Sequence, residues 1–217
     1  MIRKVATIVL CVLMVLAFVG CTESVSVTKV LPTLDNGLGS GKLFLSSSVD
    51  GFTLFREYTT SYDAKHWRVT DSKYLNMSAW VSTTDLIVMV EHVHIDCALQ
   101  STNPELDGWS VDSMDDKLAV GTQPGFYVTN QYKYQNIFAI EGYSDRLISG
   151  WGFYSTSMGW SSITEHRLTE RNLTAQGGVY AEKFQIVYDI LVRTASEPYF
   201  HTYSVIDEFV VPVASQS

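Results

Sequence analysis

One short segment carries side chains of the kinds that bind metal ions. It reads Glu91-His92-Val93-His94-Ile95-Asp96. Imidazole nitrogens and carboxylate oxygens are common zinc ligands, and a bound zinc ion activates water for hydrolysis. Successive side chains of a strand point to opposite faces, so His92, His94 and Asp96 would share one face. The segment makes a metal-dependent hydrolase one candidate function, with these three residues as candidate ligands.

The His-x-His-x-Asp spacing resembles the opening metal motif of the metallo-β-lactamase-like hydrolases. The amidohydrolases also begin with His-x-His after an apolar strand, and either resemblance implies a metal-activated water. The first family continues with a histidine where this chain has Cys97. The second needs a barrel of about 250 residues with the motif near its start. The other histidines, His66, His166 and His201, lie outside any motif of these families.

The same segment fits an ordinary strand, predicted from Asp85 to Leu99. Alternation then gives a core face broken only by Glu91: Ile87, Met89, Val93, Ile95, Cys97 and Leu99. It gives an outer face with Val88, Val90, His92, His94 and Asp96. On this interpretation the two histidines are ordinary surface residues, Cys97 is buried, and no cofactor is expected. A surface metal site shared by the histidines is the alternative.

Aromatic side chains are the second set of candidates. Gly150-Trp151-Gly152-Phe153-Tyr154 runs on to Met158-Gly159-Trp160. Rigid aromatics on a β scaffold pack against sugar rings or grip a peptide. We expect Trp151 in the core and Trp160 in a loop. The candidate ligand-binding residues are Trp160, Tyr154 and Trp109. Trp109 lies within an acidic stretch, from Asp107 to Asp116, that is expected to be a solvated loop.

Short runs bounded by turn residues predict strands. They are Lys42 to Ser47, Phe52 to Thr60, Asp85 to Leu99, Gly125 to Asn130, Asn136 to Glu141, Arg146 to Tyr154, Lys183 to Thr194 and Tyr203 to Val213. The run from Lys183 to Thr194 also fits a helical face, but its β-branched and aromatic residues favour a strand. Strands without alternating helices predict an all-β fold. We expect an antiparallel β-sandwich over residues 42–217, jelly-roll or immunoglobulin-like.

The first 21 residues resemble a lipoprotein signal peptide. Arg3 and Lys4 precede an apolar run from Val5 to Val19, and Gly20 comes before Cys21. The resemblance implies a signal over residues 1–20, a diacylglycerol on Cys21 and attachment to a membrane. Residues 21–41 are then the lipidated cysteine and a flexible tether. Ordinary cleavage near Gly20 or Cys21 and a retained anchor are the alternatives, although a spanning helix needs about 20 residues.

Charge and cysteine content narrow the function further. The net charge is −8, and loss of Arg3 and Lys4 with the signal brings it to −10, so nucleic acid is not an expected partner. Of the 3 cysteines, only Cys97 lies beyond position 21, which leaves no internal disulfide. Asn76 and Asn172 begin glycosylation sequons. The chain is expected to be an extracytoplasmic lipoprotein of the cell envelope, with a structural role or one in binding carbohydrate or protein.

Overall fold

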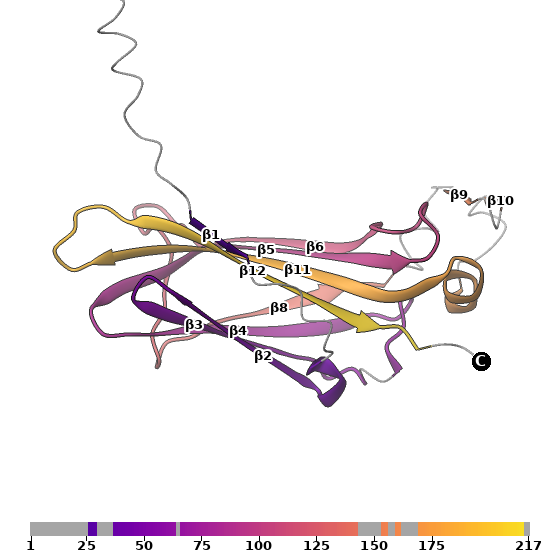
Figure 1. The fold of residues 1–217 in the computed structure, drawn as a ribbon, viewed down its shortest axis with the longest axis horizontal. Helices are drawn as coiled ribbons and strands as arrows, with labels where there is room; N and C mark the ends of the chain where they lie inside the picture. Colours follow the sequence, from indigo (N-terminus) through magenta and orange to yellow (C-terminus); the bar gives the residue numbers. More distant parts are fainter. Residues whose placement is uncertain are drawn as a thin grey trace, which may run out of the picture.

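The computed structural model describes residues 26–29, 37–63, 66–142, 153–155, 159–161 and 169–214. Two β-sheets lie one above the other in this part of the chain (Figure 1). The larger sheet has the order β1-β12-β11-β5-β6, with β7 also paired to β5. Its strands are β1 Ser26–Lys29, β5 Leu86–Ser101, β6 Ser110–Lys117, β7 Phe126–Tyr127, β11 Val179–Thr194 and β12 His201–Pro212.

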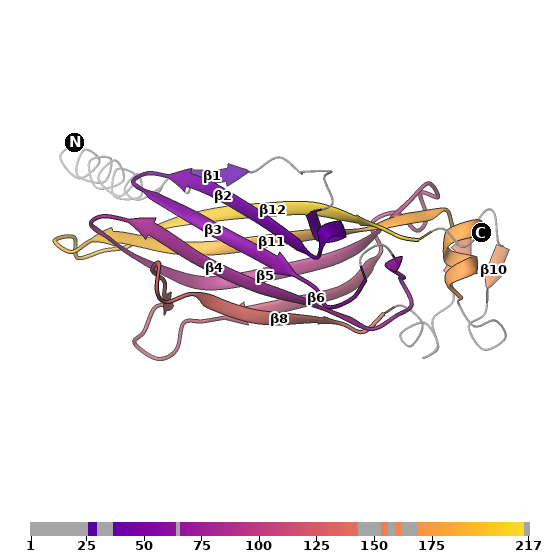
Figure 2. The same ribbon diagram turned by 90° about the horizontal axis from the view of Figure 1, so that it is seen from below.

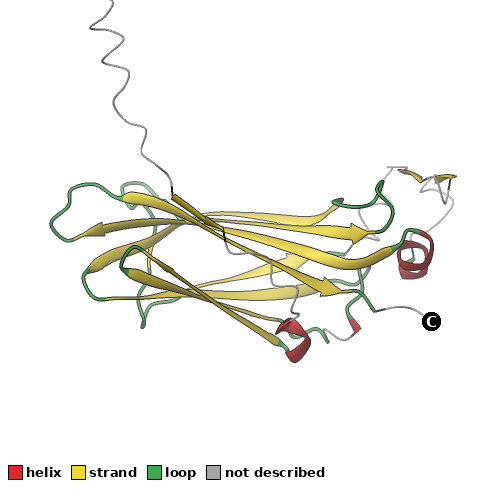
Figure 3. Cartoon of the chain, viewed as in Figure 1, coloured by secondary structure: helices red, strands yellow, loops and turns green. Residues whose placement is uncertain are grey.

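The smaller sheet has the order β2-β3-β4-β8. Its strands are β2 Lys42–Val49, β3 Phe52–Thr59, β4 Lys73–Thr83 and β8 Tyr134–Ile140. A separate hairpin joins β9 Phe153–Ser155 to β10 Gly159–Ser161, and the described helices are only the short turns η1 Gly37–Ser40 and η3 Asn172–Gln176 (Figure 3). The prediction of an all-β sandwich is confirmed.

The core forms where the inward faces of the two sheets meet. Buried and half-buried residues alternate along β3 and β4, as expected for strands with one face on a core. Figure 2 shows the smaller sheet laid obliquely over the larger one. Aromatic rings join the layers: Phe209 of β12 lies 5.3 Å from Tyr58 of β3 and 5.0 Å from Phe184 of β11, between ring centroids. Cys97 is fully buried and free, which confirms its predicted burial.

Because of a bulge at Glu91, the prediction of which side chains face the core is wrong for the first part of β5. Asp189 pairs with His92 and the next residue, Ile190, pairs with Val90, so Glu91 has no partner on β11. An extra residue reverses the alternation on one side of a bulge. Val88 and Val90 are therefore buried, and the predicted core residues Ile87 and Met89 lie on the half-exposed face. The outward placement of His92, His94 and Asp96, beyond the bulge, is as predicted.

Several other segments differ from expectation. The acidic stretch is not all loop, because β6 pairs Ser110–Lys117 with β5 and buries Val111 and Asp112. Strand β4 was not predicted, although its apolar and polar residues alternate. Within the expected tether, β1 pairs in parallel with β12, and Leu38 is buried in the core. Among the described helices, none is long and apolar enough to cross a membrane.

Candidate functional site

The predicted metal ligands lie in a cluster on the outer face of the larger sheet. We call it the histidine–aspartate cluster: His92, His94 and Asp96 of β5, Asp115 of β6 and Asp189 of β11. The Nδ1 atom of His92 lies 3.1 Å from Oδ2 of Asp189, and its Nε2 atom lies 2.5 Å from Oδ1 of Asp115. The Nδ1 atom of His94 lies 3.2 Å from Oδ1 of Asp115, and its Nε2 atom lies 2.9 Å from Oδ2 of Asp96. Strand pairing brings these residues together, since β5 lies between β6 and β11.

The electrostatics of the cluster favour a protonated His92. Burial alone would lower the pKa of His92, but its hydrogen bonds to Asp115 and Asp189 outweigh burial and raise the pKa above its usual value. The same bond to His92 lowers the pKa of Asp115. A metal needs a neutral imidazole lone pair, so these carboxylates compete with an ion for His92. No group of three or more His, Cys, Asp or Glu in the described ranges has an arrangement suited to a metal ion.

His92 should make stability depend on pH. Its pKa is raised in the folded state above 6.5, so its contribution is complete below about pH 6.5 and is lost as the pH rises through the folded value. His92→Gln should therefore destabilise the protein more at about pH 6 than at about pH 8.5. Urea denaturation at the two pH values measures the difference. His201→Gln, at an exposed position, is the control, and an equal loss at both pH values would contradict the assignment.

A second candidate surface covers the outer face of the smaller sheet. Phe44 of β2, Phe55 of β3 and Trp80 of β4 form what we call the aromatic triad. Their ring centroids lie 5.9 Å apart for Phe44 and Phe55, 5.7 Å for Phe55 and Trp80, and 5.8 Å for Phe44 and Trp80. Phe44 is 49% exposed, although a large apolar side chain is normally buried. The ammonium of Lys133 lies 3.7 Å from the centre of the Trp80 ring.

A shallow depression of about 580 Å³ lies on the same sheet face. Its lining comes from β3, β4 and β8: Glu57, Thr59, Asn76, Met77, Ser78, Gln135, Asn136 and Ile137. The depression adjoins the triad. Phe55 pairs with Trp80 across β3 and β4, and the next outward-facing pair along these strands is Glu57 with Ser78, both of which line the depression. Exposed aromatic rings and a polar-lined hollow thus form one continuous surface, which we call the aromatic face.

The aromatic residues that the sequence singled out lie elsewhere. Trp151 is outside the described residues. Trp160 is in strand β10, not in a loop, and pairs with Tyr154 of β9. Trp109 packs half-buried against the core, and its carbonyl accepts a hydrogen bond from the Leu99 amide at 2.8 Å. The triad was missed because it combines single outward residues from three strands, one of which had not been predicted.

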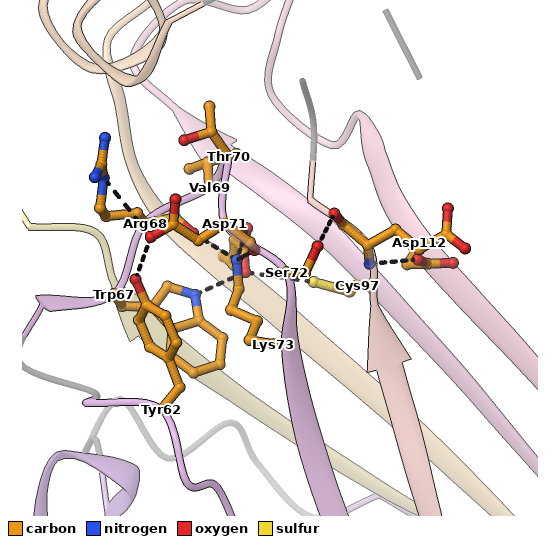
Figure 4. A network of polar contacts seen from close by, with 12 residues as sticks. Tyr62, Trp67, Arg68, Val69, Thr70, Asp71, Ser72, Lys73, Cys97 and Asp112 are labelled. Carbon is orange, nitrogen blue, oxygen red and sulfur yellow. Dashed lines mark hydrogen bonds and ion pairs between the residues drawn. The ribbon is translucent and has the colours of Figure 1, made fainter. Parts of the chain in front are cut away.

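A buried polar network connects the sheets at another place. Figure 4 shows Trp67, Lys73 and Cys97 directed toward one another. Their common partner is Glu182, which accepts from Trp67 Nε1 at 2.7 Å, pairs with Lys73 Nζ at 3.4 Å and accepts from Cys97 Sγ at 3.8 Å. Cysteine, lysine and glutamate side chains in contact also occur in enzyme active sites that use a nucleophile. Here burial raises the pKa of the Cys97 thiol well above its usual value, which keeps it protonated and unreactive.

Comparisons with known proteins do not assign the chain. No family model matches it, and no curated protein is significantly similar. One solved structure, a protein from Archaeoglobus fulgidus, is 11% identical with a TM-score of 0.22, over 81% of this chain and 96% of that one. The CooA pilin subunit from enterotoxigenic Escherichia coli is 12% identical with a TM-score of 0.14, over 64% and 80%. At such TM-scores neither likeness bears on fold or function.

Proposed function

We propose that this protein is a lipid-anchored binding protein of the cell envelope that contacts its partner through the aromatic face. The observation that carries the proposal is the aromatic triad beside the polar depression. Contact surfaces are enriched in rigid aromatic residues, which bury much apolar area at low cost in side-chain entropy. Strands hold the triad on a stable scaffold, so little ordering is needed when a partner binds.

The anchor in this proposal rests on the signal-like segment that ends at Cys21. One lipid chain binds a membrane weakly, whereas the two chains of a diacylglycerol hold stably. The partner is carbohydrate or protein, because a chain with a net charge of −8 repels the phosphates of nucleic acid. The metal-dependent hydrolase is not favoured by any observation, since the histidines of its motif are bound to carboxylates of neighbouring strands.

Substituting the lipidation site separates anchoring from binding. Cys21→Ser should release the protein from membranes, because the acceptor of the lipid is lost. Added back to envelopes of the source organism, the released protein should sediment with them through the aromatic face. The additional change Trp80→Ala should weaken that sedimentation about tenfold or more. Fractionation followed by sedimentation with isolated envelopes measures both effects.

Two results would overturn this proposal. A full-length protein that carries both Cys21→Ser and Trp80→Ala and still stays with the membrane would mean that the anchor is a retained helix. Released protein that sediments equally with and without the Trp80 ring would mean that the aromatic face is not the contact surface. Thermal melts of each variant serve as the folding control.

A further inference from the structure

We propose that the aromatic face binds an uncharged saccharide chain, an inference that rests on the binding function proposed above. The first support is the geometry of the surface. The Phe55 and Trp80 rings lie directly across from each other on β3 and β4, with 24° between their planes. The Phe44 ring is inclined to that of Phe55 by only 23°. Together the rings offer apolar area on which the C–H groups of a sugar ring can pack.

The second support is the chemistry of the depression. Five of its lining residues carry neutral hydroxyls or amides: Thr59, Asn76, Ser78, Gln135 and Asn136. Hydroxyls and amides each donate and accept hydrogen bonds, which matches the alternating donors and acceptors of a polyol. Within the described part of the chain, the buried Ser78 hydroxyl has no hydrogen-bond partner. A buried polar atom left without a partner is costly, so a ligand hydroxyl at Ser78 would remove that cost.

The third support is the charge of the surface. Glu57, in the lining, is paired with Lys42 at 2.6 Å. The ammonium of Lys133 lies over the Trp80 ring as a cation–π contact. An anionic chain would require cations directed into the depression, whereas the lining contains no lysine or arginine and the protein has a net charge of −8. The surface therefore fits a neutral ligand.

An extended peptide fits this place less well. A peptide that adds to a sheet binds the free backbone groups of an edge strand. The depression instead centres on β4, whose backbone is paired with β3 on one side and β8 on the other. A ligand over β4 therefore meets side chains and not free backbone groups, and most of the side chains that line the depression are hydroxyls and amides.

Calorimetry on the full-length protein in detergent tests the inference. The probes are β-1,4-linked hexasaccharides of glucose and of N-acetylglucosamine, with polygalacturonate as the anionic comparison. At least one neutral probe should bind. Trp80→Ala and Phe44→Ala should each weaken its binding about tenfold. Tyr74→Ala is the matched control, because Tyr74 is an exposed aromatic on the outer face of β4 outside the triad and depression.

Two further variants distinguish binding from structural roles. Ser78→Ala should weaken binding without lowering the melting temperature, since it removes a hydroxyl that has no partner in the described protein. Lys133→Ala should not weaken the binding of a neutral chain. Binding of polygalacturonate alone, lost on Lys133→Ala, would overturn the neutral ligand. Failure of all saccharides, with envelope sedimentation still dependent on Trp80, would overturn this inference and leave the proposed function standing with a protein partner.

Discussion

Replacing Arg56 with methionine should lower the free energy of unfolding by about 3–5 kcal/mol, because the Asp207 carboxylate then lies buried without its cation. Both side chains are fully buried between the sheets. Arg56 donates to the two carboxylate oxygens of Asp207, from Nε at 2.9 Å and from Nη2 at 2.7 Å. Two further N–H groups of Arg56 donate to the Leu54 carbonyl at 2.7 Å and to the Ser47 hydroxyl at 3.0 Å.

Most of the lost stability should come from the Asp207 carboxylate, which is left buried without an ion-pair partner. A double variant, Arg56→Met with Asp207→Leu, should recover most of the lost stability, since well-packed apolar residues can replace a buried ion pair. The Tyr58 hydroxyl, which donates to Asp207 at 2.6 Å, would lose that acceptor in the double variant but keep its bond to the Tyr188 hydroxyl at 3.1 Å. Urea denaturation of the Cys21→Ser protein measures the cycle. Lys42→Met, which breaks a surface ion pair, is the control and should cost at most about 1 kcal/mol. A double variant as unstable as Arg56→Met would contradict this account.

This ion pair shows how much of the fold can be predicted from the alternation of apolar and polar residues along the sequence. In β12 the inward positions hold Val205, Asp207, Phe209 and Val211, so a carboxylate at a core position was visible in the sequence. In β3 Arg56 is likewise inward, between Leu54 and Tyr58. Such residues require buried partners. The sequence does not say which partner each has, because 151 positions separate Arg56 from Asp207.

The candidate site was predictable to a similar extent. The outward direction of His92 and His94 follows from alternation beyond the bulge, but Asp115 and Asp189 reach them only through the strand order. The bulge had one visible sign, the charged Glu91 in an otherwise apolar row. The aromatic triad had none, because alternation within one strand says nothing about which residues lie beside it on neighbouring strands.

Replacing Lys73 with methionine should cost about 3–5 kcal/mol, because Lys73 balances a second fully buried carboxylate, that of Glu182. Lys73 is 2% exposed, and its ammonium donates to the Arg68 carbonyl at 2.5 Å and the Asp71 carbonyl at 3.2 Å (Figure 4). Without Lys73, Glu182 keeps only the Trp67 N–H and the weak Cys97 donor. Desolvation already raises the pKa of Glu182, even against the attraction of Lys73.

The pH dependence identifies Glu182 as the source of that cost. A carboxyl whose folded pKa is raised favours the folded state below its unfolded value, near 4.5, and this advantage is lost as the pH rises through the folded value. Loss of Lys73 raises the folded pKa further, so Lys73→Met should destabilise the protein more at about pH 8 than at about pH 5. Adding Glu182→Gln should remove most of that pH dependence. A Lys73→Met penalty that is equal at both pH values would mean that lost packing of the lysine stem, and not the unpaired carboxylate, causes it.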